Sequence, residues 1–155
     1  MTDTVTPDDT LRDKLLNPEV RPGFLAESKR LLDDEVSRKG GLAGMTVKGA
    51  YSAVKAIRPG FVEGVLDVLL DEWVAELEPE YAAWRAAGSQ GTLSAHILAR
   101  RDAVAERLLH VTDRRAASTR HTTAKKLYDR LRGSAKSQVA DALPRVGALV
   151  DRYVS

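Results

Sequence analysis

A row of carboxylates in the stretch at residues 59–80 is the first candidate for chemistry in this sequence. Glu63, Asp67 and Asp71 recur every four residues, so they share one face of a helix. Carboxylates that converge from several helices can bind two metal ions, but such sites also need a Glu-x-x-His motif on partner helices. The sequence contains no such motif. We therefore interpret the row as a solvated acidic surface, and we expect no metal site and no cofactor.

Histidine, cysteine and glycine offer no catalytic set. Of the three histidines, His96 and His110 would stand roughly 21 Å apart along one helix, too far to share an ion. Cysteine is absent, which excludes thiolate chemistry and is compatible with the reducing cytoplasm in which we expect the protein. The glycine-rich stretch at residues 40–46, GGLAGMT, lacks the Gly-Lys-Ser/Thr ending of a phosphate loop. We therefore expect that the chain is not an enzyme.

A basic segment at residues 114–132 is the best candidate for a ligand-binding surface. Such side chains, next to hydroxyl groups and the positive end of a helix starting near Thr122, can bind phosphates. The alternative is that the segment balances acidic side chains of the same chain or of a second copy. Nucleic acid ranks second as a ligand because aromatic residues are scarce and no helix-turn-helix pattern is present. The candidate surface consists of Arg114, Arg115, Arg120, Lys125, Lys126 and Arg130.

The net charge of +2 conceals blocks of opposite sign. Residues 59–80 hold seven acidic side chains and no basic one, whereas residues 100–136 hold eleven basic and four acidic ones. Surfaces of opposite sign can meet inside one chain or across a symmetric dimer, and the sequence leaves both arrangements open. The function is not determined by these patterns. The best prediction is a non-catalytic helical module that binds a protein or a second copy of itself, and the alternative is nucleic-acid or phosphate binding through residues 114–132.

Apolar residues recur at helical spacing along the whole chain, and no alternating stretch predicts a strand. The pattern predicts an all-α protein with about seven helices. We expect helices near residues 11–16, 22–38, 46–57, 93–114 and 122–131, and a last one after a break at Gly133. The longest helix should begin at Pro59, bury a stripe that includes Phe61 and Val65, and break or kink near Pro79. No apolar run approaches the roughly 18 residues of a membrane-spanning helix.

Two parts of the chain resemble each other at an offset of 77 residues. Ten of the 45 positions from Ala26 to Leu70 meet an identical residue, where this composition gives roughly three by chance. Tyr51, for example, is matched by Tyr128. We therefore predict two pseudo-repeated halves, at about residues 10–85 and 92–155, which share one core in a single helical domain at residues 10–155. Residues 1–9 are predicted to be a disordered leader without the features of a secretory signal.

Four stretches of this sequence are similar to the pattern of a known family. They are GLAGMTVKGAY, IRPGFVEGVLDVLLDEWV, LLHVTDRR and KKLYDRLRGSAKSQV. The chain resembles a family of short, all-helical bacterial proteins of unknown function, and the resemblance covers nearly everything after the leader. It implies a helical fold. It implies no catalytic residue, cofactor or partner.

Overall fold

The computed structural model describes residues 10–154, apart from the side chain at position 43, and confirms the all-α prediction. In this range seven helices follow one another without a strand. The predicted leader, residues 1–9, lies outside the described residues. The helices are α1 (Leu11–Leu16), α2 (Arg21–Arg38), α3 (Gly41–Lys55), α4 (Phe61–Ala86), α5 (Leu93–Ala99), α6 (Arg101–Ser118) and α7 (Thr122–Val154).

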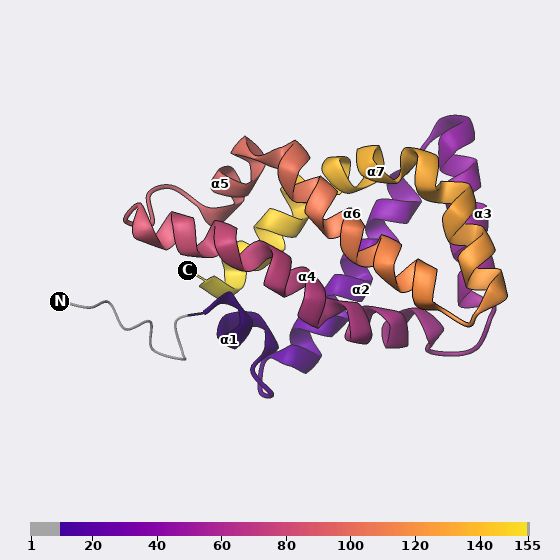
Figure 1. Cartoon of the computed structure of the whole chain (residues 1–155), viewed down its shortest axis with the longest axis horizontal. Helices are drawn as coiled ribbons and strands as arrows, with labels where there is room; N and C mark the ends of the chain where they lie inside the picture. Colours follow the sequence, from indigo (N-terminus) through magenta and orange to yellow (C-terminus); the bar gives the residue numbers. More distant parts are fainter. Residues whose placement is uncertain (1–9, 155) are drawn as a thin grey trace.

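Helices α4 and α6 run along the length of the molecule and pack against each other (Figure 1). Helix α3 and the beginning of α7 lie side by side at one end. Helix α5 and the later part of α7 pack together at the other end, where α7 also contacts α1. Helix α7 therefore changes direction along its length, and its two parts contact different neighbours.

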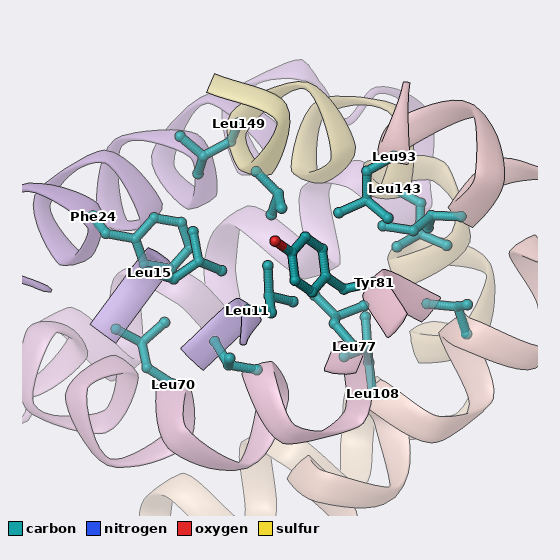
Figure 2. Packing of buried hydrophobic residues seen from close by; sticks show 14 of the residues in the cluster. Leu11, Leu15, Phe24, Leu70, Leu77, Tyr81, Leu93, Leu108, Leu143 and Leu149 are labelled. Atoms are coloured by element: carbon teal, nitrogen blue, oxygen red, sulfur yellow. The ribbon is translucent and has the colours of Figure 1, made fainter. Parts of the chain in front are cut away.

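The hydrophobic core lies at the end of the molecule that contains α1 and α5. Figure 2 shows leucines from α1, α4, α5 and α7 around the ring of Tyr81, which is almost fully buried. The core cluster contains residues of both predicted halves, as expected if the halves share one core. The pseudo-repeat itself remains a prediction.

The two shortest helices, α1 and α5, begin in the same way. Thr10 and Thr92 accept hydrogen bonds from the amide groups three residues later, as N-cap residues do. A carboxylate from a long helix completes each cap. Glu78 on α4 accepts from the first two amides of α1 at 2.8 and 3.1 Å, and Asp151 on α7 accepts from the second amide of α5 at 3.1 Å. The short helices are thus fixed to the long ones at their first turns.

Several predicted helix boundaries were wrong because packing outweighs local preference. Helix α7 continues through Gly133, where a break was predicted. Helix α4 continues through Pro79, which lies on its exposed face, so the helix does not break there, and the predicted alternative of a kink stays a prediction. Helix α3 already begins at Gly41, with Gly40 as its N-cap, rather than near residue 46. A mid-helix glycine costs only about 1 kcal/mol, which tertiary contacts readily offset.

Two further differences concern α4 and the break between α5 and α6. Helix α4 starts at Phe61 instead of Pro59, because Gly60 adopts a φ of 77° that ends the preceding turn. Val65, predicted to be buried, is 39% exposed. The helix predicted at residues 93–114 breaks at Arg100. The break lets α5 pack on α7 while α6 follows α4, an arrangement that no local sequence signal indicates.

Candidate functional site

The predicted acidic surface, Glu63, Asp67 and Asp71, is neutralised by helices α1 and α2. Arg21 donates hydrogen bonds to Asp67 at 3.0 Å and to Asp71 at 3.2 Å. Arg12 lies 3.0 Å from Asp71, and a lysine of α2 lies 3.7 Å from Glu63. The hydrogen bond from Arg21 holds the pKa of Asp71 below its ordinary value. The ion pairs of this row therefore hold α4 against α1 and α2, and the row is not a free acidic patch.

A second acidic row on α4 faces the basic helix α6. Glu72 and Glu76 lie 4.0 and 3.9 Å from Arg115 and Arg114, respectively, which are long, exposed contacts of low energy. Glu80, one turn further along, forms short bonds to α6. The acidic and basic blocks of the sequence thus meet within one chain, at least along α4 and α6. The structure brings Arg114 and Arg115 to this contact, whereas the other four residues of the predicted basic surface form no ion pair within residues 10–154.

Glu80 is 2% exposed, accepts hydrogen bonds from two arginines and lies close to a histidine. Arg107 donates at 2.6 Å and Arg100 at 3.0 Å, and Nε2 of His96 lies 3.1 Å away. Burial alone would raise the pKa of Glu80, but the hydrogen bonds from Arg107 and Arg100 outweigh it and hold the pKa below its ordinary value. Sequence reasoning missed this cluster. The sequence does contain one indication of a buried charge here, because Glu80 falls on the apolar face of α4, seven residues after Trp73.

Four members of the predicted basic surface remain exposed at the end of the molecule formed by α3 and the start of α7. They are Arg120, Lys125, Lys126 and Arg130. Among residues 10–154, none of these four side chains forms an ion pair. Helix α3 adds Lys48 and Lys55, which are also exposed, and residues 37–58 contain no acidic residue at all. We call these six side chains the basic end.

The Phe61 ring contacts residues of two loops, the one that precedes α4 and the one that precedes α7. It lies 5.0 Å from the His121 ring in an edge-on arrangement, and the guanidinium of Arg58 lies 5.4 Å from the ring centre. Position 58 precedes α4 and position 121 precedes α7. The contact therefore fixes the two loops relative to each other and sets where the neighbouring Arg120 is presented.

The outer face of α3 is apolar. Leu42 is 84% exposed and Met45 is 69% exposed, and Gly49 and Ala53 continue the same face. Large apolar side chains exposed together on a helix mark an interaction surface more often than an ordinary protein surface. The sequence pattern did not indicate this face, because the predicted helix began near residue 46, after both Leu42 and Met45.

The histidines do not form a site. His96 contacts Glu80, His110 lies 3.6 Å from Glu106 on the surface, and His121 packs on Phe61. Within residues 10–154, no group of three or more histidine and carboxylate side chains could hold a metal ion. In the same range, no helix combines the length and the apolar character needed to cross a bilayer.

Comparison with known families gives one match. Residues 11–154 match the model of a family of unknown function, DUF6918. The chain belongs to this family. No curated protein and no solved structure matches it. The predicted resemblance to an all-helical family of unknown function is thereby confirmed, and membership covers every helix described above.

Tyr51 and Tyr128, the matched tyrosines of the predicted repeat, make similar contacts in this family member. The Tyr51 hydroxyl donates to Asp33 at 2.5 Å, and the Tyr128 hydroxyl donates to Asp113 at 2.5 Å. In each case the aspartate lies on the preceding helix. Burial and the aspartate raise the pKa of Tyr128 to about 12 and raise that of Tyr51 further still. Each tyrosine thus connects its helix to the helix before it.

Proposed function

We propose that this chain is a non-catalytic binding module that docks an acidic, partly apolar protein surface on the outer face of α3 and the basic end. One observation carries the proposal: Leu42 and Met45 are exposed on a helix whose charged side chains are all basic. Apolar anchors surrounded by complementary charge are the usual composition of a protein interface, in which the anchors supply affinity and the charges supply steering.

The proposal favours a different protein over a second copy of the chain. In a two-fold symmetric dimer the same patch appears on both subunits, so Lys48 and Lys55 would face basic side chains of the second copy. The acidic side chains of α4, which could have bound the basic end of another copy, are engaged by α1, α2 and α6. These acidic side chains of α4 are then not free to bind the basic end of a second copy, which favours a different protein as the partner.

Nucleic acid is the second candidate, supported by the four unpaired side chains Arg120, Lys125, Lys126 and Arg130. Phosphate contacts need cationic side chains but no exposed leucine or methionine. The two candidates therefore make different demands on Leu42 and Met45, which provides the basis for a test.

The experiment measures fluorescence anisotropy with two labelled probes. The first is a synthetic helical peptide with leucine on one face and glutamate on the other, compared with a scrambled peptide of the same composition. The second is a 20-nucleotide DNA, as single strand and as duplex. We expect the ordered peptide to bind. The double variant Leu42→Ser/Met45→Ser should weaken peptide binding at least about tenfold, which is about 1.4 kcal/mol. Val68→Ser removes an exposed apolar side chain on a different helix, α4; it is the matched control and should leave peptide binding unchanged.

Three outcomes would overturn the proposal. DNA binding that falls with salt and with Lys126→Gln, but not with the Leu42/Met45 double variant, would assign the surface to nucleic acid. Light scattering that shows a dimer dissociated by Leu42→Ser would assign it to self-association. Failure of the ordered peptide to bind better than the scrambled one would leave the exposed apolar face without the proposed role.

A further inference from the structure

A polar cavity lies where the end of α2, the start of α3 and the middle of α7 meet. Its volume is about 470 Å³, within the range of small-molecule sites. None of the side chains in its wall was predicted from the sequence to belong to a site. The cavity is lined by Glu35, Arg38, Lys39, Gly40, Gly44, Gln138, Asp141 and Arg145.

Glu35 forms the floor of this cavity and is 5% exposed. Arg145 donates one hydrogen bond to it at 2.6 Å, and the Lys39 ammonium lies 3.7 Å from its other oxygen. A guanidinium has five N–H donors, so Arg145 keeps donors for a second acceptor. One buried carboxylate thus holds two cations in place without using up their donors, and it makes this part of the wall suited to an anionic group.

Two other groups in the wall have no protein partner. Among residues 10–154, Arg38 forms no ion pair or hydrogen bond, although it lines the cavity. The Gln138 side-chain oxygen is buried and accepts no hydrogen bond. A buried acceptor without a donor is costly, so such groups usually have a ligand or water as a partner. Asp141, three residues after Gln138 on α7, also lines the cavity, and its ion pair within residues 10–154 is a long one to Arg101, at 3.4 Å.

We propose that the cavity binds a small zwitterion of the free amino-acid type. Its carboxylate is bound by Arg38 and Arg145, and its ammonium group donates to the Gln138 oxygen and Asp141. A simple anion would leave Gln138 without a donor and would face two carboxylates. A simple cation would face three cationic side chains. Only a ligand with both charges satisfies the two sides of the wall.

The backbone around Gly44 shapes this cavity. A Cβ atom at position 44 would lie 2.5 Å from the backbone of Lys39, so only glycine permits the close turn between α2 and α3. This turn places Arg38 and Lys39 opposite α7. The cavity is thus built by a constrained backbone and not by mobile surface side chains alone.

Isothermal titration calorimetry with L-serine, L-glutamate and L-arginine tests the proposal. Each is compared with its N-acetyl form, which lacks the ammonium, and its methyl ester, which lacks the α-carboxylate. We expect at least one free amino acid to bind with a Kd below about 1 mM, and both blocked forms to bind at least about tenfold more weakly. Arg38→Gln and Gln138→Leu should each weaken binding about tenfold. Arg30→Gln, an exposed arginine two turns away on α2, is the matched control and should have no effect.

Other results would contradict the proposal. If none of the three amino acids binds, or if binding is unchanged in Arg38→Gln, the cavity is not this site. If the N-acetyl form or inorganic phosphate binds as well as the free amino acid, the cavity is a simple anion site. Chemical-shift changes of the Gln138 side-chain amide during titration provide a second readout, which does not depend on any substitution.

Discussion

Replacing Glu80 by glutamine should destabilise the protein in a pH-dependent way. The substitution keeps the size of the side chain but removes the buried negative charge between Arg107 and Arg100. Leaving one partner of a buried pair uncompensated costs about 3–5 kcal/mol. Arg100 is half exposed and can turn to water, so we take the lower limit, about 3 kcal/mol. At about 2–4 °C per kcal/mol for a chain of this size, Tm should fall by about 6–12 °C.

The pH dependence follows from the lowered pKa of Glu80 in the folded state. Its charge stabilises the native protein above the ordinary value of 4.5, and this contribution is lost as the pH falls through the lower, folded-state pKa. The difference between the parent protein and Glu80→Gln should therefore be largest near neutral pH and shrink in acid. Urea unfolding, followed by the fluorescence of the two tryptophans, measures both free energies.

Glu76→Gln is the matched control, because Glu76 lies one turn earlier on the same helix and its contact with Arg114 is long and exposed. It should cost no more than about 1 kcal/mol at any pH. If Glu80→Gln costs less than about 1 kcal/mol at neutral pH, or costs the same in acid, the buried charge of Glu80 does not stabilise the fold as described.

Three further predictions concern close contacts elsewhere in the chain. Gly147→Ala should destabilise by about 1–3 kcal/mol, because the new Cβ would lie 2.3 Å from Ser94 Oγ; a Ser94→Gly change in the same chain should recover much of the loss in thermal unfolding. Tyr128→Phe should lower stability by about 1 kcal/mol and raise the pKa of Asp113, measured by NMR titration, since the hydroxyl donates to the charged carboxylate. In a titration of tyrosine absorbance, Tyr128 should ionise near pH 12. If the absorbance change at pH 10 is smaller in Tyr128→Phe than in the parent protein, Tyr128 is already ionised at pH 10 and the prediction is wrong.

The sequence predicted the fold class well because helical periodicity is a property of the chain itself. The first helix was predicted with the bounds that α1 has, and on the named stripe of α4 Phe61 is buried as expected whereas Val65 is not. Breaks were predicted less well. Gly133 and Pro79 favour an interruption locally, but contacts made by distant helices keep both long helices intact. The opposite error occurred at Arg100, where no glycine or proline marks the turn.

The candidate surfaces were predicted in part, for a related reason. The residues of the acidic and basic surfaces were identified, but their pairing could not be, because Arg21 and Asp67 are 46 residues apart in the chain. Glu80 and Glu35 were overlooked although each falls on the apolar face of its helix. A carboxylate at an apolar position of a helical pattern predicts a buried ion pair. It shows which helix carries the buried charge, but it does not show which residue is the cationic partner.

The carboxylates that complete the first turns of α1 and α5 have a consequence for how the protein opens. Helices of six and seven residues are not stable alone in water. Their leading amide groups bond to acceptors 67 and 57 residues away, so these hydrogens are protected from exchange only while the long helices are in place. Undocking of α4 or α7 would release them together with the short helix. The amides of Leu11 and Ser94 are therefore natural reporters of partial unfolding at the core end of the molecule.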